Sequence, residues 1–437
     1  MQIFPKEIVL MVTEMLLERD IIFSIKNRCD LHLLVTDQLN KNIPVYRWYN
    51  YKHSFSRELV IELFKAFSFT PNEEKIVFDP FCGAGTTLLA AKEYGLASIG
   101  VDVMPFSVFV SEAKTTNYDV CILRSRYQKL RQHLKVYAGK SNGFDNKRKM
   151  LSPYFSKGIL NWLLYIYSWI VHQSDRNVKL FFMTGLFSIL EEISQMKRDG
   201  GFLRHCSREI NVVTAQEKLI YQIDIMLEDI ENNPIVGPVP KINTCDIRQV
   251  KTNELLIGNN SIDAIITSPP YPNRHDYTRI YGLESILGFS KKAKDIKLIR
   301  YRTLRSHVEA KESHVNENYI CPMKLKKIIA QLERNRKDLP NEEIIPMLQG
   351  YFEDMFSVFE YLHQLLKDNG FFALVVCDVR YGGIVVPVGD ILNKCAKTIG
   401  FTLMKKIIAR SKNNSAQQMK KFGKHSIMEY IFIWKKK

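Results

Sequence analysis

The residues best suited to chemistry lie at 265–271, where an apolar run meets two prolines and a tyrosine. Ser268 ends the run, Pro269 and Pro270 fix two φ angles and remove two backbone donors, and Tyr271 adds an aromatic ring. The groups left exposed are carbonyls and a hydroxyl, which accept hydrogen bonds. Acceptors directed at the two hydrogens of a base amine favour a pyramidal nitrogen with a localised lone pair. We therefore expect this corner to hold the amine of a flipped cytosine or adenine, stacked on Tyr271, while the amine receives a methyl group.

A second corner lies upstream at residues 78–87, which read Phe-Asp-Pro-Phe-Cys-Gly-Ala-Gly-Thr-Thr. Closely spaced glycines let backbone amides approach a ligand at the carboxyl edge of a sheet, and the following helix adds the positive end of its dipole. A dinucleotide site would need a third glycine, and Leu88 stands in that place, which argues against NAD. The residues expected to hold the ligand here are Asp79, Phe81, Gly83, Gly85 and Thr86.

Asp102 ends the next apolar run, where a carboxylate can accept both hydroxyls of a ribose. The two corners together therefore point to S-adenosylmethionine on one side and an amino group on the other. Cys82 invites comparison with enzymes that attack cytosine carbon 5 through a thiolate. Because it lies in the glycine corner rather than beside the prolines, we expect Cys82 to be a small packing residue.

The elements that must position these corners alternate in type. Apolar spacing predicts, in chain order, a helix over 57–67, a strand over 76–78, a helix over 87–94 and a strand over 97–101. Ser54 or Ser56 is expected to cap the first helix, and Gly95 to follow the second. A strand, a helix and a strand in succession form the βαβ unit of a parallel sheet. The sequence therefore predicts an α/β fold.

The middle of the chain interrupts this alternation, because residues 119–235 have a mainly helical pattern. The later elements expected are a strand over 262–267, an amphipathic helix from Phe352 that stops at Asn369-Gly370, and strands over 371–377 and 430–434. Two basic stretches, 124–149 and 291–305, are each compatible with a solvated helix face. We expect at least one of them to contact phosphates.

The composition fits an ordinary globular protein of 437 residues, with 46% hydrophobic and 25% charged residues. The net charge of +16 favours a polyanionic partner, although solubility alone would also account for it. Eight cysteines without a CxxC pair indicate neither a zinc site nor disulfides, and no metal is implied. No apolar run reaches the length of a membrane span and the N-terminus lacks the pattern of a secretory signal, so we expect a soluble, cytoplasmic protein.

The two corners resemble those of amino-directed DNA methyltransferases, and the serine at position 268 resembles the cytosine-N4 branch of that family. The adenine-N6 branch usually carries aspartate or asparagine there. Residues 271–277 are similar to the segment that follows the family's catalytic tetrapeptide, and residues 52–56 to its cofactor-flanking motif. Asp246 stands where a family acidic residue often meets the adenine end of the cofactor. Residues 413–419 and 429–431 also resemble this group.

The resemblance implies a Rossmann-like class I S-adenosylmethionine-dependent methyltransferase with a helical insertion. We expect a segment of unclear role at 1–45, a catalytic domain at 46–118 and 241–437, and an inserted basic module at 119–240 that helps to grip DNA. The implied reaction is site-specific methylation of cytosine N4 in double-stranded DNA by Ser268, Pro269, Pro270 and Tyr271. The implied setting is restriction–modification, in which a cognate endonuclease acts on the same site.

Three alternatives stay open at this point. One residue at position 268 leaves adenine-N6 methylation as the nearest. An RNA amino-methyltransferase is less favoured, because the short N-terminus carries no recognisable RNA-binding module. A basic DNA-binding protein with a degenerate cofactor site is least favoured, because both corners are intact.

Overall fold

The computed structural model describes residues 30–141, 143–249, 257–413 and 416–437. The predicted N-terminal segment 1–45 is therefore described only from Asp30 onward, and Cys29 lies outside the described residues. Parts of the 413–419 stretch also fall outside them.

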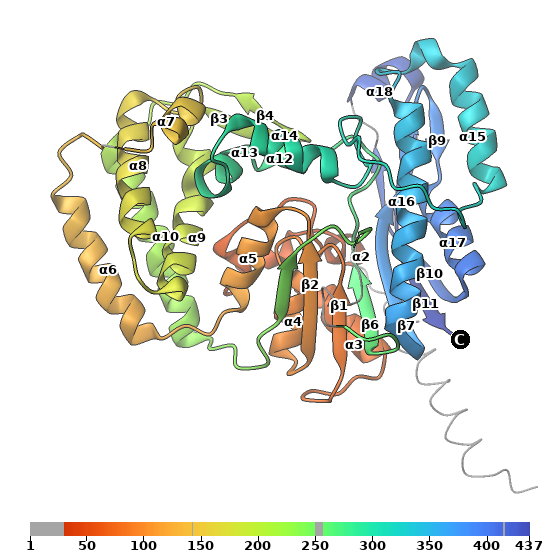
Figure 1. Ribbon diagram of the computed structural model, residues 1–437, viewed down its shortest axis with the longest axis horizontal. Helices are drawn as coiled ribbons and strands as arrows, with labels where there is room; N and C mark the ends of the chain where they lie inside the picture. Colours follow the sequence, from red (N-terminus) through yellow and green to blue (C-terminus); the bar gives the residue numbers. More distant parts are fainter. Residues whose placement is uncertain (1–29, 142, 250–256, 414–415) are drawn as a thin grey trace, which may run out of the picture.

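A seven-stranded sheet forms the centre of the molecule, in the order β10-β11-β7-β6-β1-β2-β5 (Figure 1). The strands are β1 (Ile76–Asp79), β2 (Ala97–Asp102), β5 (Lys241–Thr244), β6 (Ile262–Thr267), β7 (Leu366–Cys377), β10 (Phe401–Asn413) and β11 (Ser426–Lys436). Strands β5, β2, β1, β6 and β7 pair in parallel, and β11 is antiparallel to both β7 and β10. This order confirms the Rossmann-like α/β fold of a class I methyltransferase.

The strand order reverses beside β1, since the chain runs outward through β2 and β5 and then returns to pair β6 with the other edge of β1. Ligands of open α/β sheets bind at the carboxyl ends of the strands at such a reversal. Asp79 ends β1 and Ser268 follows β6, so both predicted corners lie at this point.

Helices cover both faces of the sheet. One face packs against α2 (Leu31–Leu34), α3 (Arg57–Ala66) and α4 (Thr86–Glu93). The other face packs against α15 (Met323–Arg334), α16 (Ile344–Leu365) and α17 (Val388–Ile399). Neighbouring residues of one strand, such as Val77 and Phe78, enter opposite cores, as expected for a strand buried on both faces.

The inserted residues form a helical lobe at the left of Figure 1. Its elements are α6 (Val120–Lys135), α7 (Asp145–Leu151), α8 (Lys157–Val171), α9 (Arg176–Ile193), β3 (Met196–Asp199), β4 (Phe202–His205) and α10 (Val212–Asn232). Its core is continuous with Val45–Tyr51, with α5 (Pro105–Thr115) and with residues 280–287. The lobe therefore shares one apolar core with these segments and does not form a separate core of its own.

Short elements complete the chain. They are η1 (Leu39–Asn42), η2 (Tyr46–Trp48), α12 (Tyr277–Ile280), α13 (Gly282–Glu284), η3 (Ser285–Phe289), α14 (Ala293–Arg302), η4 (Arg336–Asp338), β8 (Val379–Tyr381), β9 (Ile384–Val386) and α18 (Ala416–Phe422). Among the described residues, no helix combines the length and apolarity needed to cross a membrane. None of the seven cysteines in the described part of the chain forms a disulfide there.

The prediction that the amphipathic helix stops at Asn369-Gly370 is wrong. Helix α16 ends at Leu365, and Asn369-Gly370 lies within β7. Asn369 has a φ of 64°, and the pairing of β7 with β6 shifts between Ile262 and Ala264. These two residues therefore belong to an irregularity in the strand, which the same turn-forming residue types favour. The predicted boundaries of α3, β1, α4, β2 and β6 agree within one residue. Helix α16 and strands β7 and β11 begin four to eight residues before the predicted starts at 352, 371 and 430. Ser56 caps α3 by accepting from the Leu59 amide.

Candidate functional site

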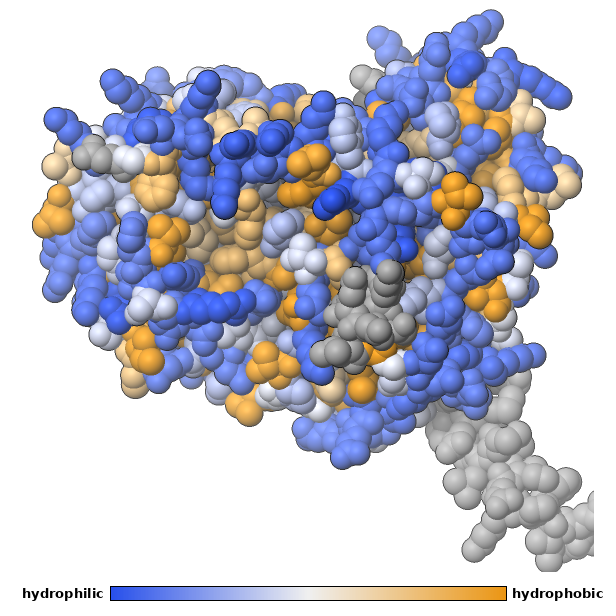
Figure 2. All heavy atoms as spheres, viewed as in Figure 1, coloured by the Kyte–Doolittle hydropathy of each residue, from blue (hydrophilic) through white to orange (hydrophobic). Residues whose placement is uncertain are grey.

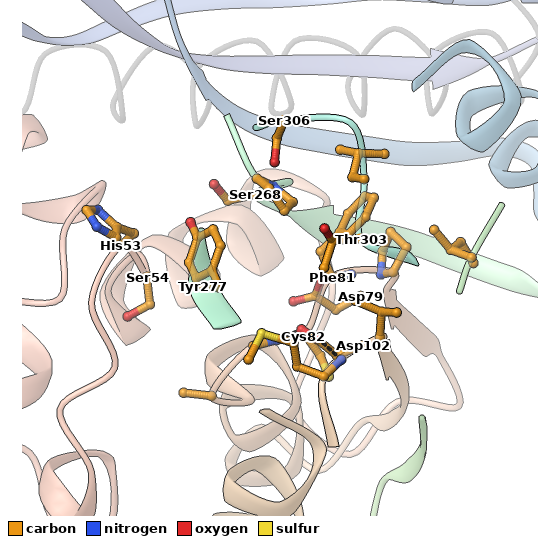
Figure 3. A pocket seen from close by; sticks show the side chains of 18 of the residues that line it. His53, Ser54, Asp79, Phe81, Cys82, Asp102, Ser268, Tyr277, Thr303 and Ser306 are labelled. Carbon is orange, nitrogen blue, oxygen red and sulfur yellow. Dashed lines mark hydrogen bonds between the residues drawn. The ribbon is translucent and has the colours of Figure 1, made fainter. Parts of the chain in front are cut away.

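An inner pocket opens at the carboxyl ends of β1, β2 and β6 (Figure 3). It brings together most of the residues that the sequence analysis assigned to the ligand: Asp79, Phe81, Gly83, Thr86, Asp102 and Asp246. Ser268 and Pro270 of the proline corner also line it. Gly85 and Pro269 do not line the inner pocket: Gly85 is the N-cap residue of α4, and Pro269 is buried.

The glycine corner has the tight geometry expected of a ligand cradle. Gly83 and Gly85 have φ values of 51° and 76°, which side chains disfavour. A Cβ on Gly85 would lie 2.9 Å from Ser111 Oγ and 3.0 Å from Ser111 Cα. The Gly83 amide donates to Asp102 at 3.1 Å, so the loop after β1 and the end of β2 hold each other in place.

Two carboxyls at the base of the inner pocket have raised pKa values. Burial raises the pKa of Asp79 to about 6, although Thr267 and the Phe81 amide donate to it. Burial also raises the pKa of Asp102 to about 6, against hydrogen bonds from the Met104 and Gly83 amides. Both groups are largely ionised at neutral pH, and Asp102 can then accept hydroxyl donors from a ligand.

Asp246 lines the inner pocket but is already engaged. Its carboxylate accepts from the Arg248 guanidinium at 2.6 to 3.2 Å. Arg248 also pairs with the buried Asp354 at 2.8 Å. The sequence did not reveal this network, because the three residues span more than a hundred positions. Asp246 can therefore contact a ligand only from within an ion pair.

The proline corner lies where the inner pocket meets a second, outer cavity. Ser268 lines the inner pocket and also an outer, open cavity, which Tyr271 lines as well. His53, Ser54, Phe55 and His307 are the other residues common to both. Figure 3 shows Ser268 between Ser306 and the group formed by Asp79, Cys82 and Asp102. A molecule in the inner pocket and another in the outer cavity would therefore meet at Ser268.

A hydrogen-bond relay starts at Ser268. Its Oγ lies 3.2 Å from both the Val375 carbonyl and the Tyr271 hydroxyl, and the Tyr271 hydroxyl donates to Glu429 at 3.1 Å. Burial, and next the nearby Glu429, raise the pKa of Tyr271 well above its ordinary value, so its hydroxyl stays protonated. Since protein acceptors take the Ser268 proton, the serine lone pairs stay available to a donor such as an amine.

Sequence reasoning missed the part that Glu429 plays in this relay. Glu429 lies in β11, is only 2% exposed, and pairs with Arg410 and Lys412 of β10 at 2.5 and 2.9 Å. Arg410 binds one carboxylate oxygen, and Lys412 and the Tyr271 hydroxyl share the other. The apolar pattern predicted a strand over 430–434, but only the resemblance of residues 429–431 to a known family linked this part of the chain to the site.

Two histidines lie close together at the outer cavity, and one of them, His53, also lines the inner pocket. The rings of His53 and His275 lie 4.8 Å apart, and His53 precedes α3 with a φ of 67°. Burial lowers the pKa of His53 to about 3 and that of His275 to about 4, so both are neutral at physiological pH. Asp276, which follows His275 in sequence, instead caps α12 and pairs with Arg300 at 2.7 Å.

Several residues that looked reactive or basic have structural partners. Burial raises the pKa of the Cys82 thiol well above its ordinary value, so it is a poor nucleophile. In the two basic stretches, Arg124 pairs with Glu231 and Arg305 with Asp354, each at 2.6 Å. No group of residues that could hold a metal ion occurs in the described ranges.

Comparisons with known proteins bear on this site. A family model described as DNA methylase matches residues 35–112, which include the glycine corner. The type II methyltransferase M.BsoBI of Geobacillus stearothermophilus is 31% identical, over 92% of this chain and 88% of its own. M.AvaI of Nostoc sp. is 30% identical, over 92% and 89%.

A solved methyltransferase from Methanosarcina mazei covers 83% of this chain and 93% of its own, with 7% identity and a TM-score of 0.28, too low to bear on function. The family therefore rests on the two relatives, which match nearly the whole chain at 30% identity or more. The glycine corner, the Asp102 carboxylate and the proline corner all lie within the span that these relatives match. This chain belongs to the amino-directed DNA methyltransferases, and its cofactor is S-adenosylmethionine.

Proposed function

We propose that the protein methylates the exocyclic N4 of a cytosine flipped out of double-stranded DNA. The observation that carries the proposal is the position of Ser268, which lines both the inner pocket and the outer cavity. A serine in this place, where adenine-N6 enzymes usually carry aspartate or asparagine, favours cytosine. Adenine N6 is the alternative, since the rest of the proline corner would serve either base.

The residues of the inner pocket fit the cofactor. Asp102 would accept the ribose hydroxyls, Gly83 leaves room for close approach, and the apolar Phe81, Met104 and Ile247 offer walls for a purine. Asp79 would add a second negative group near the base of the pocket. When bound there, S-adenosylmethionine supplies an electrophilic methyl group on a positively charged sulfur.

The proline corner would prepare the amine. Ser268 would accept one amine hydrogen, and the Pro269 carbonyl is proposed to accept the other, which localises the nitrogen lone pair. Tyr271 would pack its ring against the base while its hydroxyl stays held by Glu429. The surplus proton of the methylated amine would pass to solvent through the outer cavity, which is open.

The wider setting follows from the relatives, which are named as type II methyltransferases. We propose that the protein acts on a specific DNA site and protects it from a cognate endonuclease. The inserted lobe at 119–240 is proposed to contact DNA, with residues 46–118 and 241–437 as the catalytic part.

The test uses purified protein, labelled S-adenosylmethionine and mixed-sequence duplex DNA, followed by mass spectrometry of the nucleosides. Labelled 4-methylcytosine is the expected product. Labelled 6-methyladenine would overturn the base assignment but keep the site, and label only in an RNA control would overturn DNA as the substrate. A Ser268→Ala variant serves as the control, since it should lose the product without losing cofactor binding.

A further inference from the structure

The β3–β4 hairpin of the inserted lobe reaches the rim of the outer cavity. Gly201 and Phe202, at its tip, line the same cavity as Ser268 and Tyr271. In Figure 1 the two strands lie at the top of the molecule, beside α12 to α14. The tip therefore stands beside the place where the base to be methylated would enter.

The hairpin is anchored rigidly through strand β3. Arg198 in β3 is buried, forms an ion pair with Glu284, and pairs with Glu191 at 3.2 Å. Its guanidinium also donates to the Tyr49 hydroxyl at 2.6 Å and lies over the Tyr281 ring. Because these partners come from three separate segments, the hairpin cannot shift without breaking a buried charge network, which is costly.

The tip of the hairpin lies close to His275. A Cβ on Gly201 would lie 2.8 Å from His275 Cδ2 and 3.2 Å from the His275 Cα, so only glycine allows this approach. Gly200 turns the chain with a φ of 58°. His275 follows the proline corner closely in sequence, so the hairpin tip packs directly on the loop that carries the catalytic residues.

The outward face of this rigid hairpin has an unusual composition. Phe202 is 51% exposed and lines the cavity. Lys197 and Arg204 stand directly opposite each other in the pairing of the strands, and both are exposed. Side chains alternate along a strand, so all three lie on the same face. Asp199 lies on this face too and pairs with Arg204 at 3.4 Å, so the face carries two cations against one carboxylate. Both side chains of that ion pair are exposed, and such a pair is weak enough for a polyanion to replace the carboxylate.

We propose that this face contacts duplex DNA beside the target base, with Phe202 stacking on a base and Lys197 and Arg204 lying against phosphates. The inference rests on the proposed function, since it takes DNA as the molecule in the outer cavity. A rigidly held aromatic ring can fill the gap that a flipped base leaves, and stacking tolerates any base sequence. Hydrophilic residues border the notch between the upper lobes, with a few hydrophobic ones among them (Figure 2).

The test compares Phe202→Ala with Tyr221→Ala, a control that removes an aromatic ring 68% exposed elsewhere on the lobe. Loss of one base stack is expected to lower kcat/KM for labelled methyl transfer to duplex DNA roughly 5- to 100-fold in Phe202→Ala. Phe202→Trp should keep most of the activity, and Tyr221→Ala should stay near wild type. All three should unfold like wild type, since exposed side chains contribute little to stability.

A second measurement is independent of catalysis. The salt dependence of duplex binding should be weaker in a Lys197→Ala/Arg204→Ala variant, with the slope of log Kd against log salt reduced by up to about 1.8 for two lost phosphate contacts. An unchanged slope together with Phe202→Ala activity equal to Tyr221→Ala would overturn the inference and leave the proposed function standing. If wild type bound duplex without methylating it, the slope alone would decide the hairpin's role. A wild type that bound no duplex would overturn both.

Discussion

The glycine corner allows a sharp test of how tightly its backbone is constrained. Gly85 and Gly139 have nearly the same positive φ, 76° and 78°. A Cβ on Gly139 would meet nothing within 4 Å, whereas one on Gly85 would press on Ser111, including its Cα. Gly139→Ala therefore isolates the cost of the left-handed backbone, and Gly85→Ala adds the steric conflict with α5.

The magnitudes follow from these two terms. Alanine in the left-handed region costs about 1–2 kcal/mol. Overpacking against a backbone that cannot move costs about 1–3 kcal/mol more. We therefore expect Gly139→Ala to lower the free energy of unfolding by about 1–2 kcal/mol and Gly85→Ala by about 2–5 kcal/mol, both read from urea unfolding curves.

The cofactor gives a second readout on the same variants. At a hundredfold excess over Kd, S-adenosylmethionine should stabilise wild type and Gly139→Ala by about 2.7 kcal/mol. Gly85→Ala should gain less, because a displaced loop no longer presents the Gly83 amide and Asp102 together. Equal destabilisation in both variants, with equal gains from the cofactor, would show that the contact with Ser111 imposes no constraint on the corner.

Three further predictions concern the site. Ser268→Ala should lower kcat about 100- to 1000-fold with little change in KM for DNA, because the lost acceptor acts on the activated amine; a KM effect alone would contradict this. Affinity for S-adenosylmethionine, followed by calorimetry, should fall up to about tenfold per pH unit below pH 6, where Asp102 becomes protonated; Asp102→Asn should bind weakly and remove most of that dependence. Glu429→Ala should reduce kcat about tenfold by releasing the Tyr271 hydroxyl, whereas Glu429→Gln, which still accepts from Tyr271, should keep most activity; equal losses in the two variants would rule out the relay.

Both corners were predictable because their information is local. A strand followed by glycines, and a strand followed by two prolines, each fix the backbone within a few residues, and β1, β2 and β6 formed where the apolar runs placed them. The edge strand β10 was missed because its many lysines and arginines mask the alternation. Charged residues are typical of edge strands, where they discourage pairing with other chains.

The outer cavity was not predictable, because its walls come from distant segments. Ser268 meets Val375 across 107 positions, and Tyr271 meets Glu429 across 158. No periodicity in the sequence encodes such pairs. The β3–β4 hairpin was missed for a related reason. Arg198 anchors it through contacts with Glu284 and Tyr49, which are distant in sequence, so the role of Arg198 is visible only in the fold.

Ion pairs between distant residues also reduce the number of cations, out of the net charge of +16, that are available to bind DNA. In the sequence, Arg248, Arg305 and Arg410 count as cations that could bind DNA. In the structure, each of them is bound to a buried carboxylate. Arg248 and Arg305 pair with Asp354, and Arg410 pairs with Glu429. Breaking such a pair to reach a phosphate would strand a buried anion, at a cost of several kcal/mol. The cations that serve DNA should therefore be exposed ones, such as Lys197, and Arg204, whose partner Asp199 is itself exposed. Charge counts along the chain overestimate the binding surface, and the salt dependence of binding should be smaller than those counts suggest.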